Sequence, residues 1–454
     1  MLDIELLSRL QFAFTISFHI LFPTFSIGLA TFLLIMEGCW LKTRDPLYLS
    51  ICKFWTKVFA LTFGMGVVAG IVMEFQLGTN WAGFTKKIGS VLGPLFTYEV
   101  LTAFFIEAGF LGVMLFGWEK VGRRLHYLST CLVFCGVTIS AFWILAANSW
   151  MQTPAGVIVT EHQFVVNNWW EVIFNPSTLS RYLHMMLSAY LSTGFAIAGI
   201  CAYYLLKGKH LAFSKRCLAF ILPALALLTV LQIGVGDKVG LVIHHHQPLK
   251  TAAIEGLWDT QRGAPFIIFA IPDQHQQKNL YSLAIPYAAS LINTHQLKGK
   301  MIGLKTVSPS DQPYVPLVFF SFRIMVGIGL LMALVALIGL WLFFTQRLYS
   351  SRWFLRGCIF MSPTGFIALL AGWITSETGR QPWIVYNLIR THEAVADITL
   401  SQISISFVAL ILVYLIIFCV FYIRYLGRIL RQGPTAEVAP TDSVFRYLST
   451  TEIK

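Results

Sequence analysis

Nine apolar stretches limit what this chain can fold into. They fall near residues 10–36, 52–74, 92–117, 126–147, 184–206, 216–236, 316–345, 355–374 and 401–424. Each is long enough to cross a bilayer, because a spanning helix needs about 20 apolar residues. Only 12% of the 454 residues are charged, against about 25% in soluble domains. The sequence therefore predicts an all-α integral membrane protein with nine transmembrane helices.

The rest of the chain divides simply around these stretches. Residues 1–430 are expected to form one membrane domain, and residues 431–454 a polar cytoplasmic tail. The connection at about 238–315 is too long for a simple link and is rich in Phe, Ile, Pro and Trp, so we expect an ordered external loop. The chain starts with the acidic residues Asp3 and Glu5, whereas a cleavable signal peptide starts with basic residues. We therefore expect the first helix itself to direct insertion into the membrane.

Basic residues alternate between dense and sparse loops. The sparse loops carry only Lys86, Lys87, Arg181, Arg380 and Arg390. The dense loops carry Lys42, Arg44, Lys120, Arg123, Arg124, Lys207, Lys209, Lys215, Arg216, Arg347, Arg352, Arg356, Arg424, Arg428 and Arg431. Because basic loops stay in the cytoplasm, we predict the N-terminus outside and the C-terminus inside. The placement of the basic residues in cytoplasmic loops accounts for the net charge of +12. We therefore predict no nucleic-acid partner.

Polar residues within the apolar stretches gather at one depth. With this topology, the candidate ligands fall in the outer half of the bilayer: His19, Glu74, Glu99, Glu107, His184, Met325 and Glu377. Taken singly, a buried His or Met is more often a packing residue. Together they suit haem irons better than a substrate path, which should cross the membrane. His and Met can fill both axial positions of an electron-transferring haem, whereas one His or carboxylate leaves a position open for O₂.

Glu377 is the most unusual of these residues. It ends an apolar run in the sequence AGWITSETGRQPW, where a carboxylate is costly without a partner. Gly379 and Pro382 are expected to end the helix, and Trp383 suits the membrane interface. The residues alone do not identify the partner of Glu377.

The external loop offers a second candidate site. Lys250 and Glu255 flank a short apolar segment, followed by an aromatic, Pro-rich stretch. A quinone headgroup needs polar partners for its two oxygens and an apolar wall for its ring, and a carboxylate could accept protons from quinol. The alternative is an ordinary solvated loop, which composition alone favours.

Seven ordered stretches resemble subunit I of the cytochrome bd-type quinol oxidases. They are SRLQFAFTISFH, MEFQLGTNW, YEVLTAFFIE, WILAANSWMQ, LKTAAIEGLW, FRIM and GWITSETGRQPW, and the likeness extends from residue 1 to about residue 430. The resemblance implies a bacterial inner-membrane oxidase that takes electrons from quinol and reduces O₂ with cytoplasmic protons. It also implies a second membrane subunit, a small single-helix subunit and contact with membrane lipid.

The resemblance also assigns roles to residues. His184 and Met325 would ligate a low-spin haem b, with Arg323 as a nearby electrostatic partner. His19 and Glu377 would each ligate one haem of a pair, a high-spin haem b and a third haem, d or b. The remaining roles are quinol binding for Lys250 and Glu255, charge compensation for Arg380, and proton supply for Glu99, Glu107, Ser140, Lys57 and Glu119.

Two features depart from familiar members of the family. The external loop lacks a long insertion, which places the chain with the short-loop, cyanide-insensitive type, and Glu119 replaces an Asp. Two other functions stay open at this point. A proton-coupled transporter would lack a chromophore, and a haem-bearing quinol dehydrogenase or sensor would oxidise quinol without consuming O₂.

Overall fold

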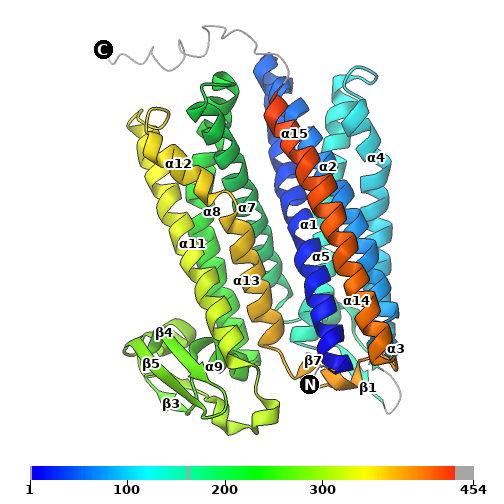
Figure 1. Ribbon diagram of the computed structural model, residues 1–454, viewed down its shortest axis with the longest axis vertical. Coiled ribbons are helices and arrows are strands. Elements are labelled where there is room, and N and C mark those ends of the chain that lie inside the picture. The colour runs from blue at the N-terminus through cyan, green and yellow to red at the C-terminus, as the bar shows by residue number, and fades with distance from the viewer. Residues whose placement is uncertain (1–2, 161–163, 435–454) are drawn as a thin grey trace.

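The computed structural model describes residues 3–160 and 164–434 (Figure 1). Within these ranges, nine helical segments are long and apolar enough to cross a membrane, as predicted. Residues 435–454 of the predicted tail lie outside the described residues. The spans are α1 (Ile4–Thr43), α2 (Pro46–Gly78), α3 (Ala82–Glu99) with α4 (Phe105–Phe116), α5 (Arg123–Gln152), α7 (Thr178–Leu206), α8 (Leu211–His246), α11 (Val315–Phe344), α12 (Arg352–Met361) with α13 (Thr364–Thr378), and α14 (Leu400–Leu415) with α15 (Arg424–Gln432).

Two of the spans contain π-helical turns. The segment η1 (Val100–Phe104) joins α3 to α4, and η5 (Ile416–Ile423) joins α14 to α15. Such turns are rare and often occur at functional sites. Nothing in the apolar pattern of the sequence predicts them.

Most helices extend beyond the predicted apolar stretches. Helix α8 continues to His246, so residues 238–246, expected in the external loop, are helical and the loop starts at Gln247. This corrects the predicted boundary. An α-helix satisfies its backbone groups internally, so it can continue past the hydrocarbon region without apolar side chains. The start of α1 is capped in the usual way, because Asp3 Oδ1 accepts a hydrogen bond from the Leu6 amide at 2.7 Å.

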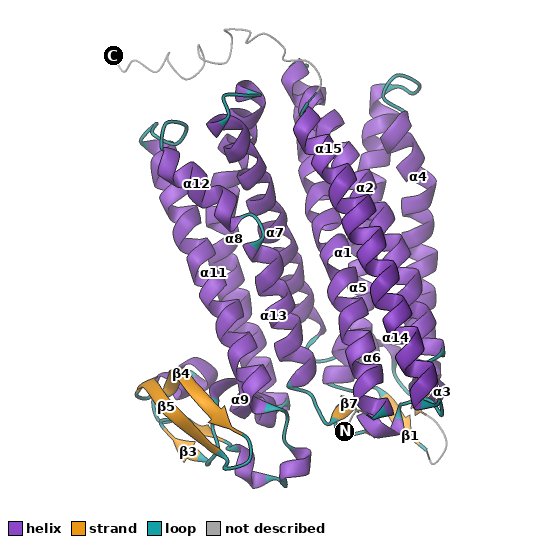
Figure 2. Ribbon diagram, viewed as in Figure 1, coloured by secondary structure: helices purple, strands orange, loops and turns teal. Residues whose placement is uncertain are grey.

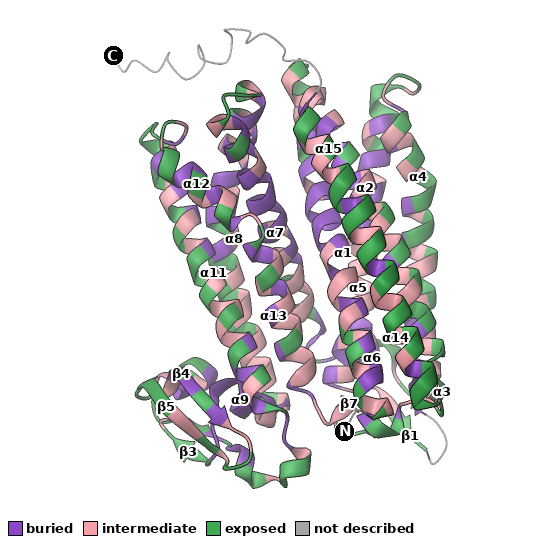
Figure 3. Cartoon of the chain, viewed as in Figure 1, coloured by how far each residue is buried: buried purple, intermediate pink, exposed green. Residues whose placement is uncertain are grey.

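The spans form two groups that meet along α1 and α7. Figure 1 shows α7, α8, α11 and α13 on one side and α1, α2, α5 and α14 on the other. The two groups approach closely at Gly28, where a Cβ atom would lie 2.1 Å from Thr193 Oγ1. Small residues at such crossings are typical of membrane helices, whose association depends on close packing. Figure 3 shows buried residues concentrated along α1 and α7, with α14 largely exposed.

Short strands and helices lie at one end of the bundle (Figure 2). Four antiparallel strand pairs occur in the described residues, and the sequence predicted none of them. They are β1 (Val157–Val159) with β2 (Phe164–Val166), β3 (Gln261–Arg262) with β6 (Lys300–Met301), β4 (Phe266–Asp273) with β5 (Lys278–Ile285), and β7 (Trp383–Val385) with β8 (Ile389–Arg390). The short helices α6 (Trp169–Ile173), α9 (Pro248–Glu255) and α10 (Ala288–Thr294) complete the connections.

The start of α1 lies at this same end, and α15 ends at the opposite one (Figure 1). The start of α1 and the external loop therefore lie at the same end of the bundle, as predicted. Which end faces the outside of the cell stays a prediction from the basic residues.

Candidate functional site

Glu377, in the last turn of α13, accepts three hydrogen bonds. Arg380 donates to Oε2 at 2.5 Å, and Asn148 and Gln152 donate to Oε1 at 3.2 and 3.1 Å. The carboxylate that had no visible partner in the sequence thus pairs with an arginine three residues further on. A carboxylate has about four lone-pair positions, so these donors leave room for one more interaction.

A second arginine, Arg181, lies in the same network as this carboxylate. Arg181 donates to Ser376 Oγ at 2.9 Å and to Asn148 Oδ1. The Nε and one terminal nitrogen of Arg380, and the Nε of Arg181, are buried without a hydrogen-bond partner among the described residues. Buried cationic groups are costly unless they are paired. Two guanidinium groups around one carboxylate therefore favour an additional anionic group at this place.

Lys250 joins the same network from the external loop. Only 1% of the residue is exposed, and its Nζ donates to Gln152 Oε1 at 2.5 Å and to Gln247 Oε1 at 2.7 Å. Gln152 in turn donates to Glu377, so one amide links the loop lysine to the helix carboxylate. Burial, and then the nearby Arg181, lowers the pKa of Lys250 well below its usual value. Gln152 ends the stretch WILAANSWMQ, but nothing in the sequence marks it as a site residue.

Glu255 occupies a neighbouring buried site. It is 2% exposed, Asn293 donates to its Oε1 at 2.9 Å, and Arg323 lies 3.5 Å from its Oε2. Arg323 also donates to the backbone carbonyls of Ile254 and Ile267. Burial raises the pKa of Glu255. The alternative of an ordinary solvated loop is therefore wrong for Lys250 and Glu255, since both are buried and hydrogen-bonded.

The three remaining candidate ligands each face a glycine of a neighbouring helix. A Cβ atom at Gly70 would lie 3.1 Å from His19 Cε1, and one at Gly372 would lie 2.7 Å from Met325 Sδ. His184 faces α8 and lies in the second turn of α7, so it does not open the helix as predicted. The Nδ1 atoms of His19 and His184 are buried and have no partner among the described residues. Buried imidazoles with a free nitrogen can ligate a haem iron.

Glu99 and Glu107 point towards α5. Ser140 donates to Glu99 Oε1 at 2.6 Å, and a Cβ atom at Gly136 would lie 2.5 Å from Glu107 Cγ. Eight residues of regular α-helix would separate the two carboxylates by about 80° around the axis. The π-helical segment η1 accommodates about one extra residue in its turn. The angle between the two carboxylates around the helix axis is therefore that of about seven α-helical residues, roughly 20°. The two carboxylates therefore lie on nearly the same face of the span because of a local feature that the sequence did not reveal.

Lys57 and Glu119, which the resemblance assigns to proton supply, lie apart from the buried network around Glu377. Lys57 is exposed, and the highly exposed Glu119 lies 3.7 Å from Lys53. A buried pair that the sequence analysis missed lies at this end instead. Glu37 accepts a hydrogen bond from Thr130 at 2.6 Å and lies 2.6 Å from Nδ1 of His126. The sequence signal for this pair is a carboxylate directly after the first apolar stretch.

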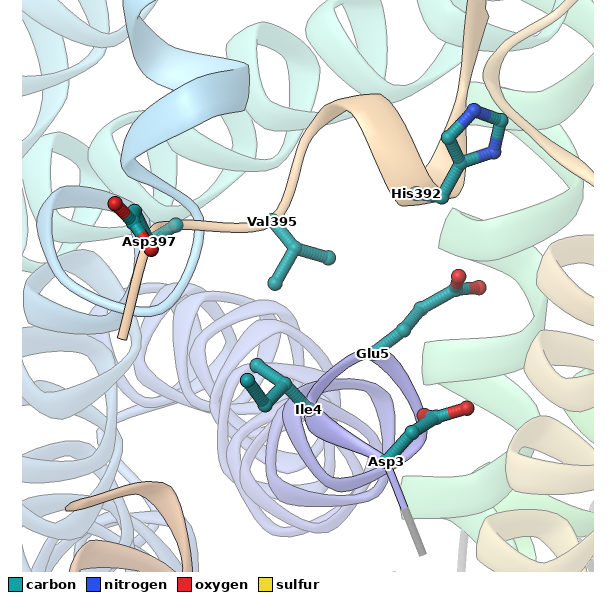
Figure 4. Close-up of a pocket in the computed structure, with 7 residues that line it drawn as sticks. Asp3, Ile4, Glu5, His392, Val395 and Asp397 are labelled. Atoms are coloured by element: carbon teal, nitrogen blue, oxygen red, sulfur yellow. The ribbon is translucent and has the colours of Figure 1, made fainter. Parts of the chain in front are cut away.

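An open surface hollow of about 430 Å³ lies near the start of α1. Figure 4 shows Asp3 and Glu5 on one side and His392 on the other. It contains none of the candidate ligands. Among the described residues, no group of three or more His, Cys, Asp or Glu side chains is arranged to hold a metal ion directly.

Fold and site together define a class of protein. It is a polytopic membrane protein with partly buried histidine, methionine and glutamate side chains in its helices and with unpaired guanidinium nitrogens near Glu377, an arrangement suited to haem and its propionates. The family model for cytochrome bd terminal oxidase subunit I matches residues 7–434. The chain belongs to this family.

Individual relatives agree over nearly the whole length. Cytochrome bd ubiquinol oxidase subunit 1 of Bacillus subtilis is 38% identical over 429 residues, which cover 90% of each chain. Cytochrome bd-II ubiquinol oxidase subunit 1 of Escherichia coli is 31% identical and covers 96% of this chain and 98% of its own. The solved structure of bd oxidase from Geobacillus thermodenitrificans matches with a TM-score of 0.89 at 28% identity, over 95% of this chain and 99% of its own.

The chain is thus a subunit of a terminal oxidase, a quinol:O₂ oxidoreductase that uses haem cofactors. It is a multi-pass protein of the bacterial inner membrane and works with a second membrane subunit. The transporter and the sensor, which the residues alone left open, are not supported.

Proposed function

We propose that four side chains of this subunit hold three haems. His184 and Met325 would hold the iron of a low-spin haem b, and His19 and Glu377 would each hold one haem of a pair. One haem of that pair is a high-spin haem b and the other is haem d or b. When bound, the haems supply the one-electron chemistry that joins quinol oxidation to O₂ reduction.

The surroundings of Glu377 carry this proposal. The carboxylate has capacity for one more interaction beyond Arg380, Asn148 and Gln152. The unpaired nitrogens of Arg181 and Arg380 lie in the same buried network and suit the two carboxylates of a haem. A purely structural network of this kind would contain enough acceptors for its own donors.

Quinol is proposed to bind at the loop residues Lys250 and Glu255. Both relatives described above are named as ubiquinol oxidases, and we extend the quinol class to this chain. Glu255 is placed to accept a proton, because burial raises the pKa of its carboxyl group. Arg323 holds Glu255 and the backbone of β4 together, so it positions the site rather than reacting in it.

Glu99 and Glu107 are proposed to pass protons towards the O₂-reducing end. They lie on one face of the third span, and Ser140 binds the outer of the two. With the predicted orientation, these protons come from the cytoplasm, with Lys57 and Glu119 at the entrance. Quinol releases its protons outside, so charge is separated across the membrane without a pump. A small single-helix subunit is also proposed.

The first experiment is a reduced-minus-oxidised spectrum of the Met325→Leu variant in the assembled oxidase. We expect the low-spin haem b signal to disappear while the other haem signals remain, because leucine has the right size but no sulfur to ligate iron. Met332→Leu is the matched control, since Met332 is buried in the same helix. An unchanged spectrum in Met325→Leu would refute the ligand assignment. Pyridine-haemochrome analysis of the same samples identifies haem d or b.

A further inference from the structure

The β4–β5 hairpin of the external loop is unusually apolar for a segment outside the spanning helices. No charged residue occurs in 263–272 or in 279–297. One face of the hairpin packs on the bundle, where Ile267 and Ala270 are buried against Phe319 of α11. Arg323 fixes this contact by donating to the Ile267 carbonyl. The hairpin is therefore held against the outer end of α11.

The opposite face of the hairpin is apolar as well, and it is exposed. Tyr281 is 83% exposed and Leu283 62% exposed, and Phe269, Ile271 and Ile285 are each close to half exposed. An antiparallel hairpin in water normally has one polar face. Clustered exposed apolar side chains indicate contact with a membrane or a protein.

This exposed face continues the outward surface of α11. The exposed large residues of α11 include Leu317, Phe320, Ile324, Leu331, Leu334 and Trp341, which follow helical spacing. They are bulky and apolar, whereas helix–helix contacts in membranes favour small or polar residues. The stripe is therefore typical of a surface that faces lipid. The ring of Phe269 on β4 lies 6.5 Å from the ring of Phe320, which joins the two surfaces.

The position of Phe320 sets the depth of the hairpin. From Leu317 to Trp341 the stripe rises about 36 Å, slightly more than the hydrocarbon core of about 30 Å. If the stripe is centred on the core, Phe320 lies just inside its edge. Figure 2 shows the hairpin beside the end of α11, at the edge of the bundle. Phe269 then lies at the boundary between acyl chains and headgroups.

We propose that the β4–β5 hairpin rests in the bilayer, with Phe269, Tyr281 and Leu283 among the lipid glycerol groups and upper acyl chains. The polar turn with Asp273 and Lys278 reaches into water. Tyrosine suits this layer, because its ring is apolar and its hydroxyl can stay hydrated. Lys278, at the turn, is the one basic residue of the two strands, and it pairs in register with Asp273. Binding is therefore predicted not to require anionic lipid. The proposal concerns lipid contact and does not depend on which residues ligate haem.

The test uses spin labels on the assembled oxidase in phosphatidylcholine nanodiscs. Leu283→Cys and Tyr281→Cys report the exposed face, and Gln276→Cys in the turn is the matched control. Cys135 and Cys419, the exposed native cysteines among the described residues, are replaced by serine, and the labelled background is subtracted. Power saturation with O₂, which concentrates in hydrocarbon, is compared with saturation by a water-soluble nickel chelate.

We expect labels at 281 and 283 to be relaxed more by O₂ than by nickel, with the reverse at 276. Adding phosphatidylglycerol should leave these ratios unchanged. Nickel-accessible labels at 281 and 283 would place the face in water and overturn the proposal. Labels protected from both reagents would show a protein partner on this face, which would also overturn it. Two independent positions guard against a variant that fails to fold.

Discussion

At the scale of single residues, the arginines around Glu377 determine how the site holds charge. Arg380 pairs with Glu377 at 2.5 Å and retains two unpartnered nitrogens. Removing one partner of a buried ion pair costs about 3–5 kcal/mol. We therefore expect Arg380→Ala to lose haem, measured as haem per protein by pyridine haemochrome. Arg390→Ala is the control, because Arg390 pairs with Asp311 near the surface. Full haem content with normal oxidase activity in Arg380→Ala would contradict the assignment.

Gln152 offers a second test at this scale. Its amide accepts from Lys250 and donates to Glu377, so Gln152→Leu would remove both contacts while keeping similar volume. An unsatisfied buried polar group costs about 1–3 kcal/mol. We expect the spectrum of the haem at Glu377 to shift and the KM for quinol to rise together. Gln402→Leu, at the exposed start of α14, is the control. If only one of the two properties changes, the amide does not link the two sites.

Sequence predicted Glu377, Arg380 and Lys250 as members of this site, but neither Arg181 nor the neutral side chains. Glu377 and Arg380 were found because charges are rare near membrane helices and therefore stand out. Asn148 and Gln152 carry no such signal, and they reach Glu377 across more than 220 residues of chain. Glu37 and His126 also meet only through helix packing. Contacts of this kind depend on tertiary structure, which a single sequence does not contain.

At the scale of elements, helix α13 controls the position of the Met325 sulfur. A Cβ atom at Gly372 would lie 2.7 Å from Met325 Sδ, so Gly372→Ala should push the thioether aside. We expect the low-spin haem b signal to weaken or shift in the reduced-minus-oxidised spectrum. Gly357→Ala in α12 is the control, because no atom lies within 4 Å of the added methyl group. A wild-type spectrum for Gly372→Ala would mean that the sulfur is not held at this position.

The π-helical segment in the third span makes a different prediction. Inserting one alanine after Leu101, an exposed residue of η1, should add one residue of helical turn and rotate Glu107 by about 100° relative to Glu99. Glu107 would then leave Gly136 on α5. We expect O₂ uptake to fall at least tenfold while haem content is retained, with Leu101→Ala as the control. Normal O₂ uptake in the insertion variant would show that the alignment of the two carboxylates is not needed.

Helix existence was predictable in this chain, and helix detail was not. Apolar length alone identifies a spanning segment, because the bilayer requires it. Apolar length does not predict the end of α8 at His246, because a helix outside the hydrocarbon region needs no apolar side chains. Apolar length also does not predict η1 or the β4–β5 hairpin, whose apolar strands are too short to cross a membrane.

At the scale of the whole molecule, the two ends of the bundle differ in charge and in structure. The end with the strand pairs also carries the start of α1, whereas the basic loops gather at the other end (Figure 1). Moving one charge across the membrane potential costs about 2.3 kcal/mol per 100 mV. The many basic residues at one end therefore predict that this end faces the cytoplasm.

This orientation can be tested with single cysteines and a membrane-impermeant maleimide on intact spheroplasts. Lys298→Cys, in the external loop, should react at once, because it is exposed at the outer end. Arg431→Cys, at the end of α15, should react only after the membrane is permeabilised, because the basic end faces the cytoplasm. Labelling of the wild-type protein measures the background reaction of the native cysteines. O₂ uptake shows whether both variants assemble into an active oxidase. Labelling of position 431 in intact spheroplasts would reverse the topology, and protons for O₂ reduction would then enter from the opposite side.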